Sequence, residues 1–243
     1  MSESPVTYHQ GDDAQLLAAS ASARESFKYF WNMVTSDFNR IIPAIEMSAI
    51  KAPFADDWYE EDPAVEHMWL DEINFDGQLI HGSLLNAPNW LQSIQQGQEV
   101  TLPLEQLGDW ICVMSGDVYG AHSVQVIRGR MDLAEREQHD AAWGLDFPPP
   151  DKVLIPQISE EFENNLAKTL AEQFAKEPAA ANAVFDEGRT LLHLSALYGR
   201  APSVITLLQH GASPAQKCNR GWTAMDYAKS LEWEEVMALL NNA

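Results

Sequence analysis

The chain has 243 residues, of which 46% are hydrophobic and 21% are charged, a composition typical of folded proteins with one large or two small domains. Its formal net charge is −21, and residues 1–157 carry most of the excess, with 25 acidic side chains against 8 basic ones. Because this field repels phosphate groups, we expect neither nucleic acid nor an anionic membrane as a partner.

The first predicted element is helical. Apolar side chains recur at helical spacing between Asp13 and Phe38, which predicts one or two helices that end before Pro43.

A series of short strands is predicted next, in residues 47–54, 65–75, 78–85, 98–104 and 109–115. The Asp76-Gly77 pair predicts a tight hairpin between the second and third strands, because Gly tolerates the positive φ of such turns. Helical spacing returns in 124–131 and 132–144, and three prolines at 148–150 then mark a boundary. We therefore expect an acidic α+β domain over 1–157, with an antiparallel sheet of about five strands and flanking helices.

The C-terminal part repeats itself with a period of 33 residues, the interval between Thr190 and Thr223. The first copy, TLLHLSA, resembles the Thr-Pro-Leu-His-x-Ala motif of ankyrin repeats, with Leu191 in the place of Pro, and the second copy is weaker. An upstream helix with Ser159 as its N-cap stands where a degenerate first repeat would lie. The resemblance implies an all-α ankyrin-repeat domain over 158–243.

Four stretches of the first half, in consistent order, carry a second resemblance: IKAPF at 50–54, EHMWLDEINFDGQLIHGSLLNAP at 66–88, QGQEVTLPLEQLGDWICV at 96–113 and YGAHSVQVIRGRM at 119–131. Residues from about 24 to 151 are thereby similar to a YegJ-like bacterial domain of unknown function. This resemblance implies an α+β fold and supplies no established chemistry, so no catalytic residue is carried over.

Motifs for catalysis or metal binding are not recognisable. The histidines at 67, 81 and 122 have no metal-ligand spacing with the nearby acids, which are Asp56, Asp57, Glu66, Asp71 and Asp109. Ser83 and Ser123 lack a nucleophile elbow, and Cys112 lies in an apolar strand. We expect no catalytic residue, metal or cofactor, and we expect His193 to join neighbouring ankyrin turns by hydrogen bonds.

Residues 54–77 contain nine acidic and five aromatic side chains and no base. Aromatics flanked by acids suit a surface that binds a basic protein, although a merely solvated acidic loop is the alternative. The predicted docking edge consists of Asp56, Asp57, Trp58, Tyr59, Glu60, Glu61 and Asp62. A second predicted contact surface lies in the ankyrin part and consists of Tyr198, Arg200, Asn219, Arg220 and Trp222.

The cellular compartment is predicted from what the sequence lacks. No basic region precedes an apolar core at the N-terminus, and no window of about eighteen apolar residues occurs. Cys112 and Cys218 lie far apart, which argues against a disulfide. We expect a cytoplasmic protein.

An ankyrin array joined to an acidic domain without recognisable chemistry indicates a binding protein. Small cytoplasmic ankyrin proteins of bacteria recur as immunity proteins, and this likeness implies a specific hypothesis. The chain would neutralise a basic toxin or secreted effector, such as a nuclease, by stoichiometric binding and occlusion. Two rival hypotheses are a housekeeping ankyrin adaptor and a metal-dependent enzyme that uses the acidic domain.

Overall fold

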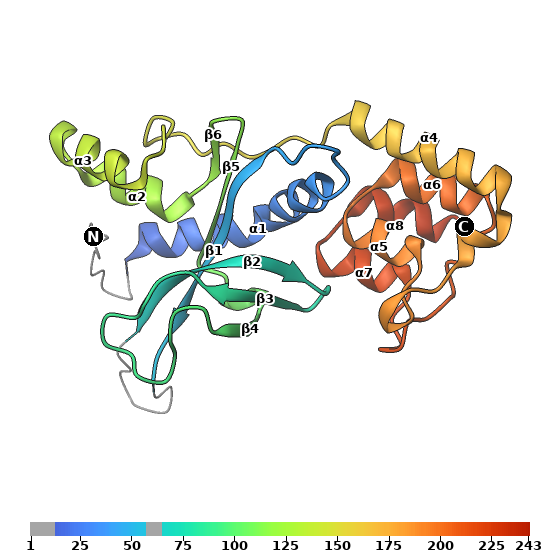
Figure 1. Ribbon diagram of the computed structural model, residues 1–243, viewed down its shortest axis with the longest axis horizontal. Helices are drawn as coiled ribbons and strands as arrows, with labels where there is room; N and C mark the ends of the chain where they lie inside the picture. Colours follow the sequence, from blue (N-terminus) through green and yellow to red (C-terminus); the bar gives the residue numbers. More distant parts are fainter. Residues whose placement is uncertain (1–12, 57–64) are drawn as a thin grey trace. The chain divides into compact units, whose positions relative to one another are not determined.

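The computed structural model describes residues 13–56 and 65–243, and the chain divides into two compact units, Met1–Pro156 and Gln157–Ala243 (Figure 1). The first unit combines helices and strands. They are α1 (Ala14–Asp37), β1 (Ile45–Phe54), β2 (Glu66–Phe75), β3 (Leu79–Leu84), β4 (Glu99–Pro103), β5 (Asp109–Met114), β6 (Asp117–Gly120), α2 (His122–Arg130) and α3 (Leu133–Trp143).

The strands form one antiparallel sheet in the order β4-β3-β2-β1-β5-β6. The prediction of about five strands is wrong by one, because β6 was not foreseen. This strand has only four residues and returns from β5 through Ser115 and Gly116, whose φ angles of 55° and 81° suit a tight primed turn. Four residues are too few to show the alternation by which the other strands were recognised.

The predicted hairpin at Asp76-Gly77 joins β2 to β3. Gly77 has a φ of 99°, a conformation that disfavours residues with a Cβ atom. The Asp76 carboxylate accepts hydrogen bonds from the backbone N–H groups of Gln78 and Leu79, both at 2.8 Å. The side chain thus holds the turn that the glycine permits.

Helix α1 covers one face of the sheet. Its N-cap is Asp13, whose carboxylate accepts hydrogen bonds from the first turn. The rings of Phe27 and Phe30 lie 5.4 Å from Phe75 and 5.3 Å from Trp110, measured between ring centroids, and all four side chains are buried. The sheet residues that alternate with these belong to a second core on the opposite face. Its buried members are Ala49, Ile111, Val113, Val118, Ala121, Val124 and Phe147.

The second unit is helical. Its helices are α4 (Glu160–Lys176), α5 (Leu191–Leu197), α6 (Ala201–Gln209), α7 (Ala224–Ser230) and α8 (Glu234–Asn241). The pairs α5–α6 and α7–α8 are the two predicted repeats, and α4 packs against α6. The Ser159 hydroxyl accepts a hydrogen bond from the N–H of Phe162, so the predicted N-cap of α4 is present. Mixed α+β structure followed by a helical unit is therefore the observed fold.

Two further features concern the described residues as a whole. Within 13–56 and 65–243, no helix combines the length and the apolar character needed to cross a membrane. Cys112 and Cys218 are both buried free thiols, and burial raises the pKa of Cys112 to about 12. A thiol with so high a pKa is a poor nucleophile at neutral pH.

Candidate partner-binding surfaces

The predicted docking edge is described only at Asp56, since the other six residues, Asp57, Trp58, Tyr59, Glu60, Glu61 and Asp62, lie outside the described residues. The Asp56 carboxylate accepts hydrogen bonds from the N–H groups of Gln92 and Ser93 and from the Ser93 hydroxyl, at 2.7–3.0 Å. These bonds, the Ser93 hydroxyl above all, lower the pKa of Asp56. Asp56 is exposed, but its carboxylate already anchors the segment that follows β3.

The ankyrin motif residues have the structural role predicted for them. The Nδ1 atom of His193 accepts a hydrogen bond from the Thr190 N–H at 3.0 Å and lies 2.8 Å from the Thr190 hydroxyl. Its Nε2 atom is therefore the protonated nitrogen, and it donates to the carbonyls of Gln216 and Trp222, at 3.1 and 3.2 Å. His193 thus ties the start of α5 to the following loop, as expected.

In the second repeat, Asp226 replaces His193 at the equivalent position. Its carboxylate accepts from the N–H and the hydroxyl of Thr223, at 2.8 and 2.7 Å, and these bonds lower its pKa. Helix α7 therefore begins with the same reciprocal capping as α5 but lacks the reach to a further loop.

The ankyrin contact residues predicted from the sequence do not all reach the surface. Arg200 is buried, its Nε lies 3.7 Å from Oε1 of buried Glu163, and its guanidinium carbon lies 5.0 Å from the centroid of the half-buried Tyr198 ring. Arg200 thus serves α4–α6 packing and offers no free cation to a partner, so including it among the contact residues was wrong. Sequence alone did not show this, because Glu163 lies on a helix 37 positions earlier in the chain.

The other three predicted residues lie together in the loop between α6 and α7. Asn219 and Arg220 are exposed, and Trp222 is half-buried with its ring 5.3 Å from both the Arg220 guanidinium carbon and the Tyr227 centroid. The N–H of Asn219 donates to the Glu187 carbonyl at 2.8 Å, which joins this loop to the preceding one. We call Asn219, Arg220 and Trp222 the loop surface. It presents one cation and one aromatic edge on a rigid base.

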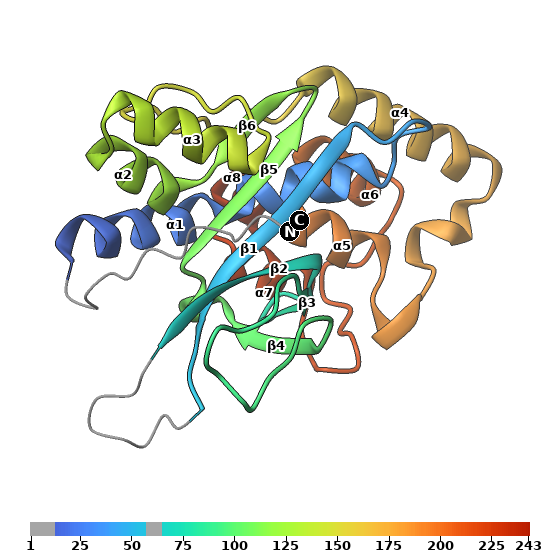
Figure 2. The ribbon, with the colours of Figure 1, turned by 60° about the vertical axis from the view of Figure 1, so that its left-hand side comes forward.

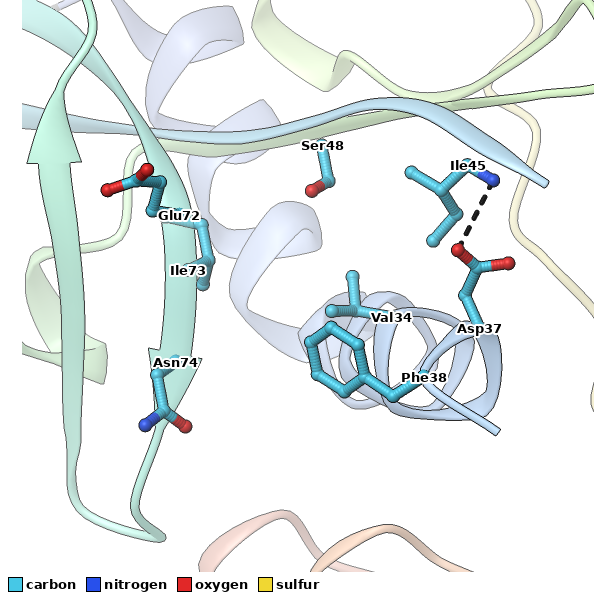
Figure 3. Close-up of a pocket in the computed structure, with 8 residues that line it drawn as sticks. All are labelled: Val34, Asp37, Phe38, Ile45, Ser48, Glu72, Ile73 and Asn74. Atoms are coloured by element: carbon cyan, nitrogen blue, oxygen red, sulfur yellow. Dashed lines mark hydrogen bonds between the residues drawn. The ribbon is translucent and has the colours of Figure 1, made fainter. Parts of the chain in front are cut away.

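A further surface, not foreseen from the sequence, lies in the first unit. A cavity of about 510 Å³ opens between the end of α1 and the strands β1 and β2 (Figure 3). Its lining residues are Val34, Asp37, Phe38, Ile45, Ser48, Glu72, Ile73 and Asn74. The Asp37 carboxylate accepts from the N–H groups of Ala44 and Ile45, at 2.8 and 3.4 Å, and thereby fixes where β1 begins.

Apolar side chains continue outward from this cavity. Phe38 is 73% exposed, Ile41 is 101% exposed and Ile42 is 79% exposed, so three large apolar residues within five positions face solvent. Clustered exposure of this kind marks interaction sites more often than scattered exposure does. The sequence contains a signal for this exposed cluster. The stretch FNRII at 38–42 lies between a predicted helix and a proline, so its apolar side chains belong to no predicted buried element.

The described residues of the rival enzyme hypothesis do not converge on a metal site. Within the described parts of the chain, no group of three or more His, Cys, Asp or Glu side chains could hold a metal ion. His81 bonds the Thr101 hydroxyl through Nδ1 at 3.0 Å, and the Glu66 carboxylate accepts from the N–H and the side-chain amide of Asn89. His122 lies elsewhere, with Nε2 3.0 Å from the Ser26 hydroxyl.

Asp109 and Ser123 form a carboxylate–hydroxyl pair of the kind found in catalytic sites, yet here the pair caps the start of a helix. The fully buried Asp109 carboxylate accepts from the N–H groups of His122 and Ser123, at 2.9 and 2.8 Å, and from the Ser123 hydroxyl. The ammonium group of Lys51 also contacts that hydroxyl. The pair therefore secures the start of α2, which follows Ala121 in the left-handed region at φ 58°.

Comparison with known proteins shows the class to which the chain belongs. Residues 13–147 match the family described as "Uncharacterized protein conserved in bacteria (DUF2314)", and residues 175–228 match ankyrin repeats. The chain is a member of this bacterial family with an ankyrin-repeat extension, and both resemblances seen in the sequence are confirmed. Ankyrin repeats are modules of protein–protein interaction, so protein binding is the function class that this architecture indicates.

Two curated relatives share this layout in whole or in part. An ankyrin repeat protein of Neisseria meningitidis serogroup B, NMB1133/NMB1171, is 35% identical over 99% of this chain and 98% of its own length. The uncharacterised protein YegJ of Escherichia coli K12 is 26% identical over 31% of this chain and 46% of its own length.

One solved structure also matches in part. It contains the predatory endopeptidase Bd0816 of Bdellovibrio bacteriovorus in complex with the immunity protein Bd3460, and the match covers 49% of this chain and 62% of that chain. The sequence identity is 22% and the TM-score is 0.30. Similarity at this level carries no inference about function or partner.

Proposed function

We propose that the chain is an immunity protein that neutralises a basic toxin or effector domain by stoichiometric binding. One observation carries this proposal: a protein-binding ankyrin array follows an acidic domain in the same chain. Residues 1–157 hold 25 acidic and 8 basic side chains. A field of this sign accelerates the encounter with a basic protein and repels nucleic acid, which such a toxin would otherwise bind. The chain would act by occlusion, without chemistry of its own, in the cytoplasm.

Each unit contributes differently to this proposal. The acidic first unit supplies attraction over a distance, which affects mainly the association rate. The loop surface supplies short-range contact, because Trp and Arg are the residue types that most often dominate binding energy at interfaces. The loop that bears them is held by the His193 bonds and by the Asn219 bond to Glu187, so little conformational entropy is lost on binding.

The experiment is a growth assay with the protein encoded beside this chain. Expression of that neighbour alone should arrest growth, and co-expression of this chain should restore it. The Arg220→Ala variant should protect less well, whereas Lys229→Ala, which removes another exposed cation of the same unit, should protect like the parent.

Two results would contradict the proposal. A neighbour that is harmless in the absence of this chain would favour the adaptor hypothesis instead. Protection that persists when the two proteins fail to form a complex would indicate an activity of the chain on another target.

A further inference from the structure

The sheet of the first unit is forked. Strand β1 pairs with β2 only from Ile50 to Phe54, opposite Glu66 to Leu70. Its earlier part, 45–49, pairs only with β5, and the later part of β2, 71–75, pairs only with β3. Figure 2 shows the two strands diverging from this point. Two strand edges are therefore open in the middle of the sheet, where a continuous sheet would have none.

The direction of the backbone groups along β1 follows from its neighbours. The Lys51 carbonyl accepts a hydrogen bond at 2.7 Å from the N–H of Gly108, which leads into β5, so the Lys51 peptide groups face β5. Because these groups alternate along a strand, those of Ser48 face the fork. No strand pairs with Ser48 on that side, because the pairing of β1 with β2 begins only at Ile50. The fork therefore leaves one N–H and one C=O of Ser48 without a strand partner.

The cavity described above lies directly beside this edge. Ser48 lines it from β1 and Ile73 lines it from β2, while Val34 and Phe38 close it from α1 (Figure 3). The volume of about 510 Å³ accommodates more than one large apolar side chain. The open edge and the cavity, whose lining is half apolar and half polar, therefore form one continuous surface.

Acidic groups border this surface. Glu72, which lines the cavity, is exposed and has a φ of 52° within a bulge of β2 that lies between Asp71 and Asn74. Asp37 is mostly covered, with its Oδ1 3.5 Å from Nε of Arg40, the one basic group among these border residues. The exposed charge that an incoming chain meets is therefore negative.

We propose that this fork binds an extended segment of a basic protein partner by strand addition. In this arrangement the backbone of the segment pairs with Ser48, an apolar side chain enters the cavity, and a flanking Lys or Arg side chain meets Glu72. The proposal rests on the proposed function for the view that the partner is a basic protein. Strand addition at the fork further specifies the site on the chain that holds this partner and the extended conformation of the bound segment.

The test uses the full chain and a blocked peptide that alternates Lys with Val. Binding should slow hydrogen exchange at the Ser48 amide. N-methylation of alternate residues on one edge of the peptide removes its hydrogen bonds and keeps its charge, so it should weaken binding by about tenfold. Equal binding of the methylated peptide, or unchanged exchange at Ser48, would overturn strand addition and leave only non-specific charge attraction.

Variants of the protein locate the site. The substitution Glu72→Gln should weaken peptide binding several-fold, because this carboxylate lines the cavity beside the fork. The matched control replaces Glu99, an exposed acid of the same unit, with Gln and should leave binding unchanged. Equal effects of the two variants would show that the peptide senses overall charge alone and would refute the site.

The same variants separate this inference from the proposed function. If the peptide binds at Ser48 but the chain gives no protection in the growth assay, the fork stands and the immunity role fails. If protection is normal and the Glu72→Gln variant neither binds the peptide less well nor protects less well, the immunity role stands and the fork is refuted.

Discussion

At the residue scale, the buried Asp109 carboxylate gathers groups from three parts of the chain. It accepts hydrogen bonds from two N–H groups and one hydroxyl at the start of α2, and Lys51 contacts the same hydroxyl from β1. Burial lowers the pKa of Lys51, and the nearby Asp109 charge opposes this effect. The Lys51 ammonium and the Asp109 carboxylate can therefore both be buried, because each charge compensates the other.

Removal of this carboxylate should destabilise the first unit strongly. Asp109→Ala leaves Lys51 without its counter-charge and removes the acceptor of four donors, so the free energy of unfolding should fall by about 3–5 kcal/mol. Urea denaturation followed by circular dichroism measures the change. Asp146→Ala removes an exposed carboxylate of the same unit and should change the value by less than about 0.5 kcal/mol. Equal losses for both variants would contradict the role assigned to Asp109.

His193 should make the ankyrin unit sensitive to mild acid. Burial lowers the pKa of His193 in the folded chain, whereas in the unfolded chain it titrates near about 6.5. Its contribution to stability is therefore complete above about pH 6.5 and is lost as the pH falls below that value. Hydrogen exchange in α5 and α7 should accelerate over this range in the parent protein.

The variant His193→Gln provides the comparison for this pH dependence. It should be less stable at all pH values, but its exchange rates should vary less between about pH 7 and pH 5.5. His122 also has a lowered pKa, but it lies in the first unit and is present in both proteins. An unchanged pH dependence in the variant would show that His193 does not titrate in this way.

At the element scale, close approach between the repeats depends on Gly199, which follows α5. Its φ is 73°, and a Cβ atom there would lie 2.4 Å from the ring of Trp233, whose Nε1 donates to the Leu197 carbonyl at 3.0 Å. Gly199→Ala combines left-handed strain with a clash, so we expect a loss of more than about 3 kcal/mol in unfolding free energy.

The control for this prediction is Gly211→Ala in the same unit. Gly211 has a φ of 82°, but a Cβ atom there would meet nothing within 4 Å, so only the strain of about 1–2 kcal/mol applies. Thermal unfolding of the two variants separates strain from packing. If both lost the same stability, the contact with Trp233 would not matter.

The elements that sequence predicted well are those determined by near neighbours. Thr190 and Thr223 begin helices through groups three positions away, and Asp76-Gly77 turns the chain within four residues. The fork, the buried Arg200 and the Asp109 cluster depend instead on groups far apart in sequence. A local pattern contains no information about which distant partner a polar side chain meets, which is why Arg200 was placed on the surface by mistake.

At the scale of the whole molecule, the charge distribution distinguishes the two units. The excess of acids lies in residues 1–157, while residues 158–243 hold 11 acids and 7 bases. Charges that are not paired in the folded protein act together over about 8–10 Å at physiological ionic strength. Under the proposed function, the first unit would attract a basic partner before any contact forms, and the loop surface and the fork would hold it.

The central claim is that the chain captures a basic protein with a 1:1 stoichiometry, and stopped-flow association with the protein encoded beside it tests this most directly. The association rate constant should fall by about tenfold or more between low and high ionic strength, while dissociation changes much less. Fluorescence titration should give one binding site. A rate constant independent of salt, or no saturable complex at all, would contradict the account.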